Sequence, residues 1–442
     1  MLSSQLDKSL KNCLREFNLR TLYSTIFLLA LPLILLRLIW RGFKAPDYFK
    51  RWNERFGNIP ARAGEQPLIW VHAVSVGEVE ACRPLIKGLQ ERYPAHQILI
   101  TTMTPTGSTR VTSLFADSVL HVYLPYDLNF AVRRFLKAMR PQFGVIMETE
   151  LWPNLILSCA EQSIPLVVAN ARLSARSARG YHKVKKLTRL MLQRVPLIAT
   201  QTHSDRDRFI ELGAFKQKIH VVGNLKYEIA VAASAVERAE SIRSLWGNRP
   251  VFIAASTHDG EEEQILDAAR KIRGQFRDLL LILVPRHPER FDRVTALCRR
   301  AGLTTLRRSE GKPCGSQIQV LVVDTMGELP IFYGTADVAF VGGSLVPVGG
   351  HNLLEPAALS RPVITGPHYF NFLEVTRQFL QHHAAIEVKN PEQLADCVIE
   401  LLQNPQRRTE MGDAGRQLIE QSKGASQRLL NLIEVHVRHA QR

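Results

Sequence analysis

The sequence lacks the residue spacings of common metal and disulfide sites. Its six cysteines, at positions 13, 82, 159, 298, 314 and 397, are dispersed and include no CxxC pair. This pattern indicates free thiols in a reducing compartment rather than a disulfide framework or a zinc site. HNLLE is not HExxH, and Asp205 and Asp207 are interpreted as acids at the start of a helix. We therefore expect no metal and no cofactor.

Acidic residues are scarce relative to basic ones. The chain has 57 Lys and Arg against 41 Asp and Glu, a formal net charge of +16. The segment 172–194 carries eight Lys or Arg and no acid. It holds a single aromatic residue, Tyr181, and no nucleic-acid-binding motif accompanies it, so nucleic acid is the weakest candidate partner. A solvated helix face, an anionic lipid surface and a phosphorylated substrate remain open.

Only one long apolar run is present, and it lies near the N-terminus. Leu22–Leu36 reads LYSTIFLLALPLILL, and with Leu38, Ile39 and Trp40 it approaches the length that spans a bilayer. Basic residues follow it: Arg37, Arg41, Lys44, Lys50, Arg51 and Arg55. No small-residue cleavage site is present. The pattern predicts an anchor at an anionic membrane surface with the globular body on the cytoplasmic side. A helix lying in the interface is the alternative.

The length of 442 residues favours two domains of about 200 residues each. Short apolar runs recur, each followed by a helical pattern, which is typical of buried parallel strands. They are 68–72, 98–102, 120–124, 143–147, 165–168 and 197–200, then 251–255, 279–284, 320–323, 338–341 and 362–365. The array restarts near residues 225–250. We expect two doubly wound α/β domains with a cleft between them.

The expected domain bounds follow from these runs. Residues 1–45 form the anchor and its basic flank, and residues 46–228 form the N-terminal domain. Residues 229–442 form the C-terminal domain, whose last helix is able to pack back on the first domain. Residues 1–18 predict a short amphipathic helix to which we assign no role.

A carboxylate follows the first strand directly. In VHAVSVGEVEA, Ser75 and Gly77 form a turn and Glu78 stands at the first residues of a helix. Acids are favoured there because the helix dipole and the unpaired N–H groups attract negative charge. Ligands of open α/β sheets also bind at the carboxyl ends of strands, so the same position predicts a site.

The second domain offers a glycine-rich segment that is neither a Walker A motif nor GxGxxG. Gly342 and Gly343 turn the chain after a strand, and Gly349 and Gly350 lead to a helix expected near His351. Such glycines expose N–H groups to an anion. Glu355 lies one turn after Asn352, where it can accept hydrogen bonds from a ribose diol or form a capping box.

Other polar residues follow strands of the same domain. They are Ser256 and Thr257; Pro285, Arg286 and His287; and Gly327 and Glu328. Each is a strand-end position where an α/β domain places its ligands, although any one alone is also compatible with a helix cap.

Eight motifs together closely resemble bacterial 3-deoxy-D-manno-octulosonic acid (Kdo) transferases. They are SVGE (75–78), TTMTPTGS (101–108), YLPYD (123–127), METELWPN (147–154), NARLS (170–174), VPRHPERF (284–291), DTMGEL (324–329) and GGHNLLEP (349–356). The resemblance covers the chain from about residue 22 to its C-terminal helix. It implies the GT-B fold, attachment to the cytoplasmic face of the inner membrane, the donor CMP-Kdo and the acceptor lipid IVA.

The resemblance also implies roles for individual residues. Glu78 matches the general base, ionised but weakened in basicity by the helix N-terminus, of an inverting transfer. Glu148 and Lys226 match positions that stabilise the transition state. The CMP site is matched by Pro285, Arg286, His287, Met326, Gly327, Glu328, Asn352, Leu353, Leu354 and Glu355. Further candidate contacts are Ser75, Gly77, Ser256, Thr257, Gly349 and Gly350. Helix N–H groups and Arg286 would stabilise the departing phosphate without a divalent ion.

Two other functional classes remain open. One is a GT-B enzyme that uses another nucleotide sugar, which competition by UDP rather than CMP would reveal. The other is a membrane-tethered binding protein without activity, against which the joint presence of Glu78, Lys226 and Glu355 argues.

Overall fold

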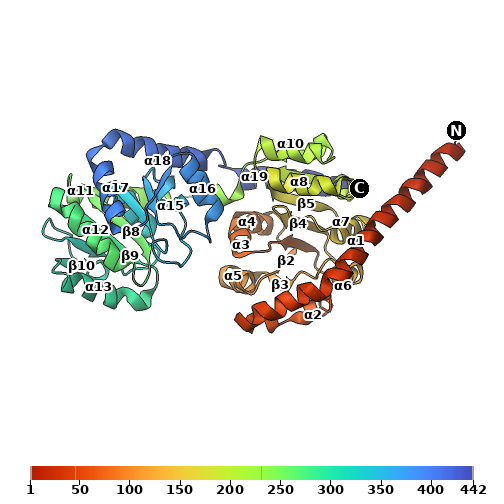
Figure 1. Cartoon of the computed structure of the whole chain (residues 1–442), viewed down its shortest axis with the longest axis horizontal. Helices are drawn as coiled ribbons and strands as arrows, with labels where there is room; N and C mark the ends of the chain where they lie inside the picture. The colour runs from red at the N-terminus through yellow and green to blue at the C-terminus, as the bar shows by residue number, and fades with distance from the viewer. Residues whose placement is uncertain (1, 45, 230, 441–442) are drawn as a thin grey trace. The chain divides into compact units, whose positions relative to one another are not determined.

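The computed structural model describes residues 2–44, 46–229 and 231–440, and it divides into two compact units (Figure 1). Unit 1 comprises Met1–Glu228 and Gly424–Arg442, and unit 2 comprises Ile229–Lys423. The longer segment of unit 1 ends at Glu228. The C-terminal segment belongs to unit 1.

Unit 1 is built on a seven-stranded parallel sheet of order β3-β2-β1-β4-β5-β6-β7. The strands are β1 Leu68–His72, β2 Gln97–Thr102, β3 Leu120–Tyr123, β4 Phe143–Met147, β5 Leu166–Ala171, β6 Leu197–Thr200 and β7 Ile219–Val221. The larger helices are α1 Leu2–Lys44, α3 Val76–Ala81, α4 Arg83–Arg92, α5 Pro105–Phe115, α6 Asn129–Met139, α7 Pro153–Glu161, α8 Ala175–Lys183, α9 Lys185–Arg194, α10 His203–Glu211 and α19 Ala425–Ala440. Shorter turns are η1 Pro46–Phe49, α2 Trp52–Arg55, η2 Ala116–Ser118, η3 Lys216–Lys218 and η4 Leu225–Tyr227.

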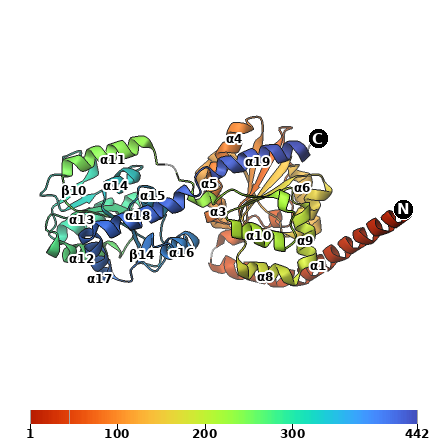
Figure 2. The ribbon, with the colours of Figure 1, turned by 90° about the horizontal axis from the view of Figure 1, so that it is seen from above.

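The core of unit 1 lies on both faces of its sheet. Successive strand side chains point to opposite faces, so Val71 packs with α4 and α19 while Trp70 packs with α6 and α7. Figure 2 shows α19 lying beside α4. Arg92 of α4 forms an ion pair with Glu434 of α19. The end of the chain is thus an integral layer of unit 1.

Unit 2 repeats this architecture with the order β10-β11-β9-β8-β12-β13-β14. Its strands are β8 Val251–Thr257, β9 Leu280–Pro285, β10 Thr305–Arg307, β11 Val320–Val322, β12 Val338–Val341, β13 Val363–Thr365 and β14 Ala385–Glu387. Its helices are α11 Ala233–Trp246, α12 Glu262–Gln275, α13 Phe291–Arg300, α14 Leu329–Thr335, α15 Leu354–Ala358, α16 Leu373–Gln381, α17 Pro391–Gln403 and α18 Pro405–Glu420, with the turns η5 Pro288–Arg290 and η6 Arg308–Glu310.

In each sheet the strand order reverses at the first strand of the unit, which fixes where ligands are expected. In unit 1 the reversal lies between the neighbours β1 and β4, and in unit 2 between β8 and β12. Crevices at such points, outside the carboxyl ends of the strands, are the usual ligand positions of open α/β sheets.

Helix α1 is one continuous helix from Leu2 to Lys44. The helix predicted for residues 1–18 is thus present over the described residues 2–18, but it is the first portion of the long helix α1 rather than a short helix. Within α1, Asn18–Phe43 contains an 18-residue window with a mean hydropathy of 2.2 and is long and apolar enough to cross a membrane.

Candidate functional site

Glu78 lies beside the strand reversal of unit 1, in the turn after β1. Ser75 is the N-cap of α3, and the Glu78 carboxylate folds back onto the turn. Its Oε2 accepts the Val74 N–H at 2.7 Å, and its Oε1 accepts the Ser75 hydroxyl at 3.1 Å. The carboxylate therefore stabilises the turn, and it stands at the carboxyl end of β1, where a ligand is expected.

The electrostatics of Glu78 differ from expectation. The helix N-terminus was expected to lower the basicity of this carboxylate. Instead its pKa is raised to about 8, first by burial and then by the negative charge of Glu148, with the Val74 hydrogen bond opposing both. The side chain is only 8% exposed. A six-residue helix has a small dipole, and removal of a carboxylate from water costs more than that dipole returns.

Glu148 and Lys226, predicted from separate parts of the chain, meet in unit 1. Lys226 Nζ lies 2.6 Å from Glu148 Oε1. Glu148 follows β4 with a positive φ of 58°, a conformation that non-glycine residues adopt rarely and that is typically held by surrounding structure. Asn170, at the end of β5, accepts the Leu225 N–H at 2.9 Å, while Asn224 accepts the Lys226 N–H at 3.0 Å. These two amides hold the η4 turn that carries the lysine.

Glu150 is a third carboxylate in this region that the sequence analysis did not single out, although it lies within the METELWPN motif. Burial raises its pKa, opposed by a 2.9 Å hydrogen bond from the Trp152 indole. Its charge also contributes to the raised pKa of Glu78. The site thus contains three interacting carboxylates and one lysine, enough to hold a proton acceptor beside a fixed positive charge.

In unit 2 the glycine-rich segment is organised around a buried acid that the sequence analysis did not single out, Glu261. Its carboxylate accepts the backbone N–H groups of Gly343 at 2.7 Å, Ser344 at 3.0 Å and Leu345 at 2.9 Å. A side chain at Gly342 would lie 2.7 Å from Glu261 Oε2, so this approach requires glycine. The Glu261 carboxylate thus takes the position that a bound anion would otherwise have at these N–H groups.

The anion cradle predicted at Gly349 and Gly350 is wrong in detail. Their N–H groups both donate to the Gly343 carbonyl, at 3.1 and 2.8 Å, and are therefore not directed to a ligand. The following helix, α15, begins at Leu354 rather than near His351. It is five residues long, so its dipole is correspondingly small.

A cavity of about 370 Å³ in unit 2 brings together two predicted residues, Gly327 and Glu355. Its remaining lining is apolar: Ile229, Val231, Leu329 and Pro330. Asn352 accepts the Leu354 N–H at 3.1 Å and donates to Glu355 Oε1 at 3.4 Å. The capping box expected from Asn352 and Glu355 is not formed, because Leu353 is the N-cap of α15 and Glu355 accepts from the Asn352 side chain rather than from its backbone. Glu355 also lines a space of the size that small-molecule sites occupy.

The other predicted residues of unit 2 described next do not line this cavity. Glu328 is engaged by Arg308 at 3.1 Å, by Arg238 at 2.9 Å and by the Thr325 hydroxyl at 2.5 Å, and these groups lower its pKa. Met326 is 69% exposed. Pro285, Leu353 and Leu354 are buried. Thr257 donates to Glu262, which also receives Arg290, and Ser256 has a φ of 57°.

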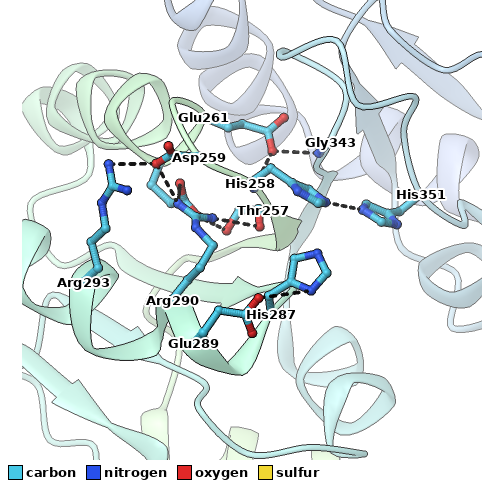
Figure 3. Close-up of polar contacts among 11 residues, drawn as sticks. Thr257, His258, Asp259, Glu261, His287, Glu289, Arg290, Arg293, Gly343 and His351 are labelled. Atoms are coloured by element: carbon cyan, nitrogen blue, oxygen red, sulfur yellow. Dashed lines mark hydrogen bonds and ion pairs between the residues drawn. The ribbon is translucent and has the colours of Figure 1, made fainter. Parts of the chain in front are cut away.

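Three histidines gather at the strand ends of unit 2 (Figure 3). His258 and His351 stack, with their Nε2 atoms 2.8 Å apart, and the His287 ring lies edge-on to His258 with centroids 5.4 Å apart. Burial, His258, Arg286 and His287 lower the pKa of His351 to about 4, and burial with His287 and Arg290 lowers that of His258. At neutral pH these two rings are uncharged hydrogen-bonding groups, and the neighbouring Arg286 carries the positive charge.

No metal-binding group of three or more His, Cys, Asp or Glu side chains occurs among the residues that the structure describes. Asp205 lies in the first turn of α10, as predicted, where it accepts the Leu173 N–H and the Thr202 hydroxyl.

Comparison with known proteins shows matches over most of the chain. Residues 50–229 match a family model described as 3-deoxy-D-manno-octulosonic-acid transferase (kdotransferase), and residues 251–418 match glycosyl transferases group 1. The 3-deoxy-D-manno-octulosonic acid transferase of Haemophilus influenzae is 43% identical, covering 95% of this chain and 99% of that protein.

Two solved structures are similar to this chain, one over its C-terminal part and one over most of its length. The C-terminal CMP-Kdo binding domain of WaaA from Acinetobacter baumannii is 38% identical, covering 43% of this chain and all of that one, with a TM-score of 0.42. Acinetobacter baumannii MurG is 14% identical, covering 84% of this chain and all of that one, with a TM-score of 0.53. The second likeness concerns the fold alone. The likeness to MurG and the two parallel seven-stranded sheets together confirm the expected GT-B fold class.

Proposed function

The chain belongs to the Kdo transferase family of glycosyltransferases, and from that membership we propose that it transfers Kdo from CMP-Kdo to the lipid A precursor lipid IVA. The transfer is inverting and takes place at the cytoplasmic face of the inner membrane, as a step of lipopolysaccharide biosynthesis. The observation that carries the proposal is the buried Glu78 carboxylate beside the Glu148–Lys226 pair, at the strand reversal of unit 1.

Glu78 is the general base of the proposed reaction. A sugar hydroxyl of the acceptor attacks the anomeric carbon of Kdo, its proton passes to Glu78, and the bond to the CMP phosphate breaks with the electron pair leaving on CMP. A pKa of about 8 makes Glu78 a stronger base than an ordinary carboxylate. The ionised form is required, so kcat/KM rises with pH up to about 8.

Lys226 and Glu148 stabilise the charges of the transition state. The lysine faces the negative charge of the donor, and Glu148 orients it through their 2.6 Å ion pair. Both side chains are largely buried, at 18% and 22% exposed, where electrostatic interactions are stronger than in water.

The nucleotide of the donor binds in unit 2. The ribose hydroxyls donate to Glu355 in the 370 Å³ cavity, and the exposed Arg286 neutralises the phosphate. Since Glu261 already occupies the N–H groups of residues 343–345, Arg286 rather than that turn supplies the phosphate contact.

The test is mass spectrometry of the product formed from lipid IVA and freshly generated CMP-Kdo. Addition of Kdo to lipid IVA is expected, with inhibition by CMP and none by UDP. Inhibition by UDP alone would favour another nucleotide sugar. Absence of any transfer by protein that binds CMP would favour a binding protein without activity.

A further inference from the structure

Helix α1 presents a continuous apolar stripe to solvent. The stripe consists of Leu22, Ile26, Leu29, Leu33, Leu36, Trp40 and Phe43, spaced three or four residues apart, and each residue is between 58% and 79% exposed. Residues at this spacing share one face of a helix. The stripe extends about 32 Å at 1.5 Å per residue. An exposed apolar surface of this length marks an interaction site.

From Leu19 onward, the opposite face of α1 is packed on unit 1. At one end Leu19 and Tyr23 contact Leu187 and Leu190 of α9. In the middle, four apolar side chains pack around Tyr126, Leu128 and Ala131, namely Phe27, Leu31, Ile34 and Leu35. At the other end Leu38 is buried, and the Phe49 ring lies against Gly42. The two faces of α1 are therefore distinct, one docked on unit 1 and one exposed to solvent.

Buried polar contacts fix the N-terminal end of the docked face. Arg20 is 9% exposed and donates to Asn154 at 3.0 Å and to Ser158 at 2.7 Å, and it forms an ion pair with Glu161. Ser24 donates to Asn154 at 3.2 Å. Buried hydrogen-bonded charges of this kind are costly to separate because each partner would be left unsatisfied.

This docking is incompatible with a helix that crosses the bilayer. A crossing would place the two ends of residues 22–43 on opposite sides of a hydrocarbon core about 30 Å thick. The surface of unit 1 beside α1 would then enter that core, including the exposed ion pair of Arg133 with Glu161. Charged groups and loops facing lipid are excluded from the hydrocarbon.

We propose that α1 binds an anionic bilayer by lying in its plane, with the stripe of residues 22–43 immersed at the boundary of headgroups and acyl chains. Arg37 and Arg41 on α1 are exposed, as are Lys185 and Lys186 at the start of α9, which packs against α1. Each is able to contribute up to about 1 kcal/mol of attraction to an anionic leaflet. Figure 2 shows α8, α9 and α1 on one side of unit 1, so the basic segment 172–194 adjoins α1.

The test measures depth along the helix in the full-length protein bound to vesicles of phosphatidylethanolamine and phosphatidylglycerol. Single cysteines at positions 22, 29, 36 and 43 carry spin labels in a background with Cys13→Ser and Cys314→Ser, and collision with oxygen and a water-soluble nickel complex reports depth. The expected result is one shallow depth, roughly 5–10 Å, for all four labels. A profile with labels 22 and 43 at the headgroups and the middle labels near the bilayer centre would overturn the proposal, as would four labels in water.

A paired variant tests whether the stripe itself binds lipid. Leu29→Glu with Leu33→Glu should lower vesicle binding in flotation at least about tenfold, because two apolar side chains leave the bilayer. Both positions are at least 70% exposed, so the thermal unfolding transition in detergent should not change. Leu245→Glu, at an 81% exposed leucine of α11, is the matched control and should float like the parent. Undiminished flotation of the paired variant would refute binding through the stripe.

Discussion

At the scale of single residues, Glu78 combines a structural and a chemical function. Its hydrogen bonds to Val74 and Ser75 keep it in one orientation, which a proton acceptor needs. Burial and the neighbouring Glu148 raise its pKa, which makes it a stronger acceptor. A substitution that removes the charge of Glu78 but keeps an acceptor oxygen abolishes its function as a base while retaining hydrogen bonds from the turn. The two functions can therefore be separated by experiment.

Glu78→Gln tests the chemical function. Glutamine retains an oxygen that accepts from the turn but cannot take the proton of the acceptor hydroxyl. Transfer should fall by at least ~10², with CMP binding by calorimetry unchanged, because the nucleotide is assigned to unit 2. Glu91→Gln, at an exposed carboxylate of α4, is the control and should transfer normally. Turnover near that of the parent enzyme by a folded Gln variant would exclude Glu78 as the base.

The same variant makes a prediction for stability against pH. The folded-state pKa of Glu78, about 8, lies above its ordinary value of 4.5. Between these values the unfolded chain is ionised while the folded chain holds the proton, so folding loses stability as pH rises from about 4.5 to 8. Glu78→Gln removes this loss. Its Tm relative to the parent should increase from pH 5 to pH 8 and then level off.

Scanning calorimetry across this pH range measures the effect, with Glu91→Gln as the reference. A Tm difference between Glu78→Gln and the parent that stays constant with pH would mean that burial does not raise the pKa of Glu78.

Glu355→Ala tests the donor site in unit 2. Loss of a carboxylate that accepts from the ribose should weaken CMP binding by roughly 1–3 kcal/mol, or about 5- to 150-fold in Kd. Calorimetric titration with CMP measures this. Glu263→Ala, at an exposed carboxylate of α12, is the control. An unchanged Kd for Glu355→Ala would exclude Glu355 as a ribose contact and leave it with its local hydrogen bond from Asn352.

At the scale of elements, the central strands could be predicted from the sequence and most edge strands could not. The eleven apolar runs correspond to β1–β6, β8, β9 and β11–β13. The three strands without such a run are β7, β10 and β14, and each is three residues long and lies at the end of its sheet. A central parallel strand is buried on both faces and reads as a continuous apolar run, whereas an edge strand such as Ala385–Glu387 is partly exposed.

The loop after β12 shows why part of the site could not be predicted. The glycines at 342–350 were correctly associated with a turn, but the partner of their N–H groups, Glu261, is more than eighty positions away and belongs to the segment after β8. No local pattern specifies such a pairing. In the same way, Glu148 and Lys226 were assigned to one site only through the family resemblance. Their spacing in the sequence alone does not predict their ion pair.

Glu261→Gln tests the organisation of this loop. The amide presents an N–H₂ group where the carboxylate accepts from Gly343, so at least one buried backbone donor loses its acceptor. The expected cost is about 1–3 kcal/mol of unfolding free energy, measured by urea denaturation of the whole chain. CMP binding should weaken as well, because the loop leads to Asn352 and Glu355. Glu263→Gln, on the exposed face of α12, is the control, and equal stability of the two variants would contradict the assigned function of Glu261.

At the scale of the whole molecule, the proposed chemistry is distributed between two units with separate cores. The proposed base and the Glu148–Lys226 pair belong to unit 1, and the proposed nucleotide contacts belong to unit 2. The first and last helices both pack on unit 1. Helix α1 covers one part of its surface, and α19 contributes Leu429 and Ile433 to its core. The N-terminal helix is thus a component of the fold as well as a surface for lipid.

Truncation distinguishes a component of the fold from a detachable anchor. Deletion of residues 1–43 uncovers the apolar surface around Tyr126 and Leu128 and leaves Asn154 without its partners Arg20 and Ser24. The Tm of unit 1 in non-ionic detergent should fall by roughly 10 °C, while CMP binding in unit 2 persists. Deletion of residues 1–17 keeps these contacts and should unfold like the parent protein. If both truncations unfold at the parental temperature, α1 contributes nothing to unit 1 and serves membrane attachment alone.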